Sequence, residues 1–225
     1  MSTPKESLRQ LLANLHAERV ASWEPAVLQV NIDQRQTLID NYEPSKHVQV
    51  GQKLDNFSLE EVDGKTLVLD ELLAKGPVAL VFFRFAGCPA CNIALPYYKR
   101  QLAPALQELG ATLVGVSPQV PERLVEIKRR HDLNFLVATD RDNALGRRFG
   151  ILYTYDEASQ KASLAKGGGI GETTGTGTWE LPQPTVVLID RDRVVRFVEV
   201  SPDWLVRSEA DAIVEQVRAL SAVAA

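Results

Sequence analysis

The sequence of 225 residues has few of the residue types that bind metals: two cysteines, three histidines and one methionine. A structural zinc site needs about four ligands. His16, His47 and His131 lie at no ligand spacing from the cysteine pair, so we expect no bound metal and no other cofactor. A single cysteine pair in a reducing compartment is also better explained by reversible redox chemistry than by a permanent disulfide.

Long apolar runs and an excess of charge of one sign are also missing. No stretch is long enough to span a membrane, and residues 1–15 lack the apolar core and cleavage site of a secretory signal. We therefore expect a cytoplasmic protein. The formal net charge of −4 provides no basic field for nucleic acid or an anionic membrane surface, which leaves small molecules and proteins as partners.

Both cysteines fall in one segment, Cys88-Pro-Ala-Cys91. It follows an apolar run, residues 78–85, which is typical of a buried strand, and it precedes a segment with helical character. Pro89 suits the first turn of a helix. The spacing places the two sulfur atoms one turn apart, and the positive end of the helix dipole favours a thiolate. We therefore interpret the first sulfur as a nucleophile at an exposed helix start.

Residues 1–45 are predicted to form a helical extension. Thr3-Pro4-Lys5-Glu6 has the pattern of a helix start, and a second helix is expected over residues 25–41, before Glu43-Pro44-Ser45 interrupts the pattern. Leu8, Leu11, Leu12 and Leu15 form an apolar stripe. This stripe either covers its own domain or meets a second copy in a homodimer.

Residues 46–225 are predicted to form one α/β domain with a mixed sheet. A hairpin is expected across Asp63-Gly64, and strand, helix and strand over residues 112–139 indicate parallel pairing. The cysteine helix should bend at Pro96 and Pro104. The glycine-rich segment 166–178 is interpreted as a mobile loop. Further strands and the last helix are expected at residues 78–85, 185–190, 194–200 and 208–220.

The order of these elements resembles the thioredoxin fold. Cys88-Pro-Ala-Cys91 matches its redox pair, Pro96 follows at the same distance as in thioredoxins, and Gln183-Pro184-Thr185 is similar to the segment that carries their cis-proline. Residues 50–59 and 188–197 look more like the peroxiredoxin branch, specifically the peroxiredoxin-like (AhpC/TSA, redoxin) proteins with a CxxC motif. The resemblance implies a three-layer α/β/α fold with a central mixed sheet.

The chain departs from both patterns. Counted from Cys91, which the resemblance places at the peroxidatic position, the proline and hydroxyl residue of true peroxiredoxins are replaced by Arg84 and Cys88, and Pro184 stands where their late arginine would be. Counted from Cys88, those two upstream positions hold Val81 and Phe85. In true peroxiredoxins the hydroxyl and guanidinium groups polarise the O–O bond and hold the thiolate. Loss of one such group can reduce the rate of peroxide reduction by about 10²-fold or more. Relative to thioredoxins, Gly87 replaces a tryptophan and Phe82 a buried acid.

The leading hypothesis is therefore a thiol-disulfide oxidoreductase with a role in antioxidant or thiol homeostasis. Cys88 would attack a protein or small-molecule disulfide, and Cys91 would resolve the intermediate. Gly87 and Gln183-Pro184-Thr185 would bind substrate, the backbone of Gln183 through hydrogen bonds and Pro184 as a cis residue.

Several alternatives remain open. The chain resembles a thiol-dependent peroxidase that reduces hydrogen peroxide or organic hydroperoxides, and a non-enzymatic redox sensor is a third hypothesis. An external thiol reductant, a thioredoxin or glutathione system, would return the electrons. Arg84 either lowers a thiol pKa or points outward into an ion pair.

Overall fold

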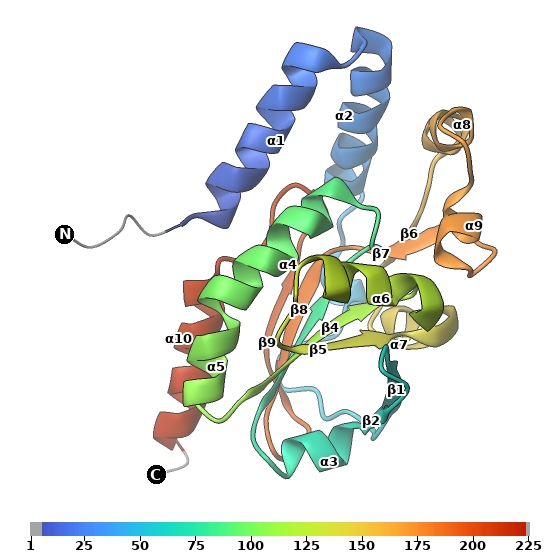
Figure 1. The fold of residues 1–225 in the computed structure, drawn as a ribbon. Coiled ribbons are helices and arrows are strands. Elements are labelled where there is room, and N and C mark those ends of the chain that lie inside the picture. The colour runs from blue at the N-terminus through green and yellow to red at the C-terminus, as the bar shows by residue number, and fades with distance from the viewer. Residues whose placement is uncertain (1–5, 224–225) are drawn as a thin grey trace.

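The computed structural model describes residues 6–223. Seven strands form the main sheet in the order β2-β1-β5-β4-β3-β8-β9, with helices on both of its faces (Figure 1). The sheet strands are β1 (Ser58–Glu61), β2 (Thr66–Val68), β3 (Val78–Phe82), β4 (Thr112–Ser117), β5 (Leu136–Thr139), β8 (Thr185–Ile189) and β9 (Val195–Val200). The predicted mixed sheet is confirmed: β3, β4 and β5 are parallel neighbours, whereas β8 is antiparallel to β3 and to β9.

Every residue of β3 is buried because the strand lies at the centre of the sheet. Successive side chains of a strand point to opposite faces. Ala79 and Val81 join the core on one face, and Val78, Leu80 and Phe82 join the core on the other. The continuous apolar run in the sequence is thus explained by two cores that share one strand.

The helices complete three layers. One face is covered by α4 (Pro89–Gln101), α5 (Ala103–Glu108), α6 (Pro121–Arg130) and α10 (Ala210–Val223). The other face is covered by α3 (Leu69–Leu73) and α7 (Ala144–Arg148), together with Phe149. The expected bend in the cysteine helix is present as a break between α4 and α5 at Leu102, two residues before Pro104. Pro96 lies within α4.

The first helix begins later than predicted. α1 (Leu8–Ser22) has Ser7 as its N-cap, and Thr3 and Pro4 lie outside the described residues. The Glu209 carboxylate accepts hydrogen bonds from the N–H groups of Leu8 and Arg9, at 3.1 and 2.9 Å, and from the Ser7 hydroxyl at 2.9 Å. These bonds satisfy N–H groups that a helix start leaves without partners. A carboxylate from the start of α10 therefore determines where α1 begins.

The second helix, α2 (Pro25–Asp40), agrees with the predicted range and runs alongside α1 (Figure 1). Leu8 and Leu12 are buried in the core beside α4, and Leu11 and Leu15 pack against it. The apolar stripe therefore covers the chain's own domain. A homodimer stays a prediction.

The glycine-rich segment contains structure that the sequence did not predict. α8 (Glu157–Ala165) precedes it, α9 (Ile170–Thr174) lies within it, and β6 (Leu152–Thr154) pairs with β7 (Glu180–Pro182) on its far side. Gly171 is required because a Cβ there would lie 2.5 Å from the backbone nitrogen of Thr178. The segment interpreted as a mobile loop therefore contains a short helix, and its mobility stays a prediction.

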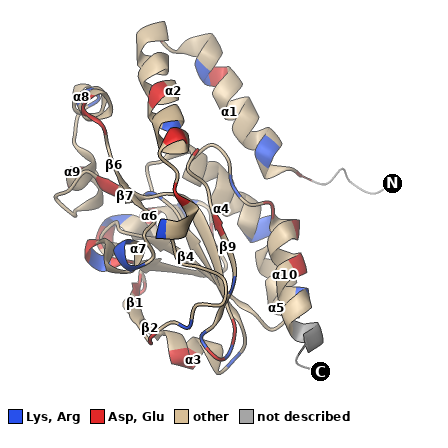
Figure 2. Cartoon of the chain, turned by 180° about the vertical axis from the view of Figure 1, so that it is seen from behind, with Lys and Arg blue, Asp and Glu red and all other residues tan. Residues whose placement is uncertain are grey.

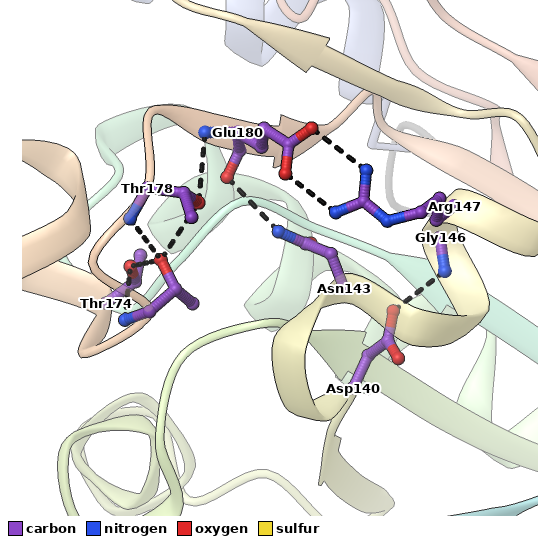
Figure 3. Close-up of polar contacts among 8 residues, drawn as sticks. Asp140, Asn143, Gly146, Arg147, Thr174, Thr178 and Glu180 are labelled. Carbon is purple, nitrogen blue, oxygen red and sulfur yellow. Dashed lines mark hydrogen bonds and ion pairs between the residues drawn. The ribbon is translucent and has the colours of Figure 1, made fainter.

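We call the segment from β6 to β7, residues 152–182, the insert. Polar contacts attach it to the main domain. Glu180 in β7 forms an ion pair with Arg147 of α7 at 2.7 Å, and its carbonyl accepts a bond from Asn143 (Figure 3). The hydroxyl groups of Thr174, Thr176 and Thr178 form a chain of contacts that ends at the N–H of Glu180. The insert is therefore held at the end of the sheet where α8 faces α2.

The surface carries both signs of charge. Lys and Arg, and Asp and Glu, are scattered along the described chain, and neither sign is confined to one part of the fold (Figure 2). Within residues 6–223, no helix has the length and apolar character needed to cross a bilayer.

Candidate functional site

The turn that delivers the cysteines to α4 is fixed by side-chain hydrogen bonds. The Asn92 amide donates to the carbonyls of Ala86 and Cys88, at 2.7 and 2.9 Å. The N–H of Ala86 donates to the Gln119 side chain at 2.7 Å. Cys88 is the N-cap of α4, and its sulfur accepts the N–H of Cys91 at 3.4 Å. The helix start therefore directs an N–H group to Cys88 as predicted.

The expectation that Cys88 is exposed is wrong. Cys88 is 1% exposed and Cys91 0%, and both are free thiols. Gly87 and Pro89 on either side of Cys88 are exposed, so the backbone reaches the surface while the thiol points inward. The cover comes from elements far away in the sequence, as the pocket described below shows.

The two thiols ionise as a coupled pair. Burial disfavours charge on Cys91, but the Cys88 thiol donates to its sulfur and the Arg207 and Arg84 guanidiniums attract negative charge, so the pKa of Cys91 is well below its ordinary value. Burial, followed by the interaction with Cys91, holds the pKa of Cys88 well above the ordinary value. The first proton therefore leaves Cys91, and the resulting thiolate accepts a hydrogen bond from Cys88.

Arg207 is the functional residue that the sequence interpretation missed. Its guanidinium donates to the Cys91 sulfur at 3.4 Å, and its Nε donates to the carbonyl of Trp204. It is buried, in the segment between β9 and α10. The position that aligned with the late arginine of peroxiredoxins holds Pro184, so no local signal identified Arg207. The fold nevertheless supplies a cation at the buried sulfur.

Arg84 points inward, so the outward ion-pair alternative is wrong. It is buried, donates to the Tyr155 hydroxyl, and its guanidinium carbon lies 4.9 Å from the centre of the Trp204 ring. Within the described residues it forms no ion pair with a carboxylate. Its positive charge lowers the pKa of both cysteines, against burial as the largest effect. This geometry supports Arg84 as a thiolate stabiliser, which stays a prediction until the thiols are titrated.

A pocket of about 300 Å³ leads to Cys88. One wall is formed by the helical extension and the other by α8 and the segment after it, both of which rise from the same end of the sheet (Figure 1). Arg84, Phe85 and Trp204 also line it. Cys91 does not line the pocket. Of the two cysteines, a molecule in this pocket therefore contacts Cys88 and not Cys91.

None of the predicted substrate-binding residues lines this pocket, although Gly87 directly precedes Cys88 in the chain. Gln183, Pro184 and Thr185 do not line the pocket, and Pro184 and Thr185 instead surround a small cavity beside Arg207. The N–H of Gln183 is already bonded to the carbonyl of Ile151 at 2.8 Å, and its carbonyl accepts the Thr185 hydroxyl. No peptide bond in the described residues is cis, so the cis assignment of Pro184 is wrong. A role of these residues in substrate binding stays a prediction.

Comparison with known proteins identifies the family. The model of the AhpC/TSA family matches residues 50–198. Peroxiredoxin Bcp of Bacillus subtilis is 28% identical over 104 residues, which are 46% of this chain and 65% of that protein. The thiol-disulfide oxidoreductase ResA of Bacillus cereus is 31% identical over 97 residues, 42% of this chain and 53% of that protein. The chain therefore aligns with about half to two thirds of the length of these relatives.

The solved structures agree on the fold. The crystal structure of peroxidoxin BcpB from Mycobacterium tuberculosis superimposes with a TM-score of 0.61 at 22% identity, covering 77% of this chain and 99% of that one. The peroxiredoxin type of thioredoxin-like fold, as predicted, is thereby confirmed. The relatives include both peroxidases and disulfide oxidoreductases, and both are thiol-based enzymes. The comparisons do not decide between these two activities.

Proposed function

The chain belongs to the AhpC/TSA family, and from this premise we propose that it is a thiol-dependent peroxidase that reduces small hydroperoxides. The observation that carries the proposal is the position of Cys88, which is 1% exposed but lines a pocket of about 300 Å³. A hydroperoxide fits such a pocket, whereas a disulfide on a folded protein needs an exposed sulfur. The buried guanidiniums of Arg84 and Arg207 provide the positive charge that the sequence patterns lacked.

In the first step, the Cys88 sulfur attacks the terminal oxygen of the hydroperoxide. The Cys88 proton passes to the Cys91 thiolate, which acts as the general base, and the O–O bond breaks. The alkoxide that leaves takes this proton from Cys91 and departs as an alcohol. Cys88 is then a sulfenic acid, and the Cys91 thiolate has been regenerated beside Arg207.

In the second step, the Cys91 thiolate attacks the sulfur of the Cys88 sulfenic acid. The S–S bond forms, the S–O bond breaks, and hydroxide leaves and is protonated to water. The two thiols have lost two electrons, and the hydroperoxide has gained them. An external thiol reductant, such as a thioredoxin or glutathione system, restores the pair by thiol-disulfide exchange.

Disulfide reduction is the second candidate. Cys88 caps a helix whose first turn also holds Cys91, and a helix start lowers the cost of the thiolate that exchange requires. The similarity to ResA supports the same chemistry. With Cys88 buried, this activity would be limited to small disulfides that enter the pocket.

Rapid mixing distinguishes the candidates. Reduced protein is mixed with stoichiometric hydrogen peroxide, and thiol oxidation is followed by tryptophan fluorescence, since Trp204 lines the pocket with Cys88. Oxidation within milliseconds that Cys88→Ser abolishes supports the peroxidase. Turnover of insulin or a small disulfide without reaction with peroxide would contradict it. A redox sensor would turn over neither the peroxide nor the disulfide.

A further inference from the structure

The pocket over Cys88 is lined by positive charge that no carboxylate balances. Arg19, Arg84 and Lys166 contribute to its wall, and none of its lining residues is an aspartate or glutamate. Arg19 lies in α1 and is 5% exposed. Lys166, which follows α8, places its Nζ 4.3 Å from the centre of the Trp23 ring. Two cations from opposite walls thus meet at one tryptophan, because the Arg19 guanidinium carbon is 4.8 Å from the same ring.

The carboxylate of Asp203 does not neutralise the charges of Arg19, Arg84 and Lys166. Asp203 pairs with Arg35 at 3.1 Å, which makes that pair neutral. The Arg19 guanidinium donates to the Asn31 side-chain oxygen at 3.4 Å, and within residues 6–223 it forms no ion pair with a carboxylate. Burial and the nearby arginines lower the pKa of Arg19, and the attraction of Glu18 is too small to offset them. One thiolate in the cysteine pair offsets one of the cations Arg84 and Arg207. Buried charges are normally paired, so the reduced site has a surplus of positive charge.

Two buried donors beside the pocket also have no partner. The Nε2 atom of Gln34 and the Nε atom of Arg84 are inaccessible and make no hydrogen bond among the described residues. Both residues line the pocket and are at least nine-tenths buried. The Gln34 oxygen accepts the Trp204 indole N–H at 3.3 Å, which leaves only its amide N–H groups for another acceptor. A buried donor without an acceptor costs free energy, and an oxygen-bearing ligand would supply one.

We propose that the preferred substrate is an organic hydroperoxide that carries a carboxylate and a short apolar body. This inference rests on the proposed function and names the substrate class of the same site. The peroxide group reaches Cys88, the carboxylate lies between Arg19 and Lys166, and the body packs on the apolar part of the lining. The apolar residues are Trp23, Val27, Val30, Phe85 and Ile170. A guanidinium matches the geometry of a carboxylate.

The proposal gives the helical extension a role in specificity. Arg19, Trp23, Asn31 and Gln34 all come from α1, α2 or the turn that joins them. These residues lie outside the segment that matches the family model, which begins at residue 50. The chemistry of the two cysteines thus belongs to the family domain, whereas one wall of the binding pocket belongs to the extension.

The test compares two hydroperoxides of nearly the same size. One is cumene hydroperoxide with a para-carboxylate, and the other has a neutral para-carboxamide. Oxidation of reduced protein should be faster with the acid by about tenfold or more. Lys166→Gln and Arg19→Gln should each lower this ratio, and Arg19→Lys should retain part of it. The readout is the ratio of the two rates within each variant, so an equal effect of a substitution on the reactivity of the thiols with both hydroperoxides cancels.

A matched control is Lys161→Gln, because Lys161 is exposed on α8 and pairs with Glu157 outside the pocket. It should leave the ratio unchanged. Lys166 is also exposed, so the test stands even if Arg19→Gln does not fold. Equal rates for acid and amide in the wild type would overturn the proposal.

Binding of the corresponding alcohols separates this inference from the proposed function. The para-carboxy cumyl alcohol should quench tryptophan fluorescence more strongly at a given concentration than its carboxamide, and Lys166→Gln should weaken this effect. If the carboxylate binds but neither hydroperoxide oxidises the thiols, the peroxidase fails and the anion site stands. If both hydroperoxides oxidise the thiols equally fast and both alcohols bind equally, the anion site fails and the peroxidase stands.

Discussion

Replacement of Arg207 by methionine should raise the apparent pKa of the thiol pair. The guanidinium donates to the Cys91 sulfur at 3.4 Å, and a hydrogen bond to a charged group contributes about 1.5 to 3 kcal/mol. One pKa unit corresponds to about 1.4 kcal/mol, so the expected rise is about one to two units. Methionine keeps an unbranched side chain in the buried position but removes the charge.

The assay is the ultraviolet absorbance of the thiolate as a function of pH, with Arg207→Lys as the matched control that keeps a positive charge. The lysine variant should titrate closer to the wild type than the methionine variant. In parallel, the rate of thiol oxidation at neutral pH should fall in Arg207→Met and recover as the pH is raised. An unchanged pKa in a folded Arg207→Met protein would refute the assignment of Arg207 as the cation that holds the thiolate.

Ionisation of Cys91 links stability to pH with a definite sign, opposite to that of Cys88, whose pKa is raised in the folded protein. The pKa of Cys91 is lower in the folded protein than in a free cysteine. Its ionisation therefore stabilises the fold fully above the unfolded-state pKa, and this contribution is lost as the pH falls through the folded-state pKa. The free energy of unfolding of reduced Arg207→Met should show a smaller dependence on pH over this range than that of the wild type.

Three further predictions concern the resolving thiol, the helical extension and the insert. Cys91→Ser should react with one equivalent of hydroperoxide and keep a sulfenic acid on Cys88, detectable by dimedone labelling and mass spectrometry. Glu209→Ala should destabilise the fold by about 1–2 kcal/mol in denaturant unfolding and speed alkylation of Cys88. Burial raises the pKa of Glu209, but hydrogen bonds from Arg9, Tyr97 and Leu8 lower it overall. Its stabilising effect should therefore be lost as the pH falls through the folded-state value, so the difference in free energy of unfolding between wild type and Glu209→Ala should shrink in acid. Gly171→Ala should cost about 1–3 kcal/mol through a clash with the backbone of the neighbouring turn, and unchanged stability would contradict the close approach.

The sequence predicted the framework because its signals are local. The apolar run before Cys88 and the strand that begins at Thr185 show their burial in their composition, and both are interior strands with a neighbour on each side. Pro104 indicated the break in the cysteine helix, since proline lacks the N–H that a continuous helix needs. The position of Cys88-Pro-Ala-Cys91 likewise predicted that the first cysteine lies at the start of the helix, one turn from the second.

The surroundings of the thiols could not be predicted in this way. Arg207 reaches Cys91 from 116 residues further along the chain, in a segment with no regular structure of its own. The pocket over Cys88 depends on where residues of the extension such as Trp23 are placed, and helical periodicity identifies an apolar stripe without its partner. The glycines around Gly171 suggested mobility, but a close approach of two backbone segments also requires glycine.

The central claim is that Cys88 meets the substrate and Cys91 resolves it. The most direct measurement is the site of oxidation after reduced Cys91→Ser and Cys88→Ser proteins are each mixed with one equivalent of hydroperoxide and trapped with dimedone. The account predicts labelling of Cys88 in Cys91→Ser, more slowly than the oxidation of Cys88 in the wild type because the Cys91 base is missing, and little or none of Cys91 in Cys88→Ser. Rapid labelling of Cys91 in Cys88→Ser, together with no labelling of Cys88 in Cys91→Ser, would contradict it.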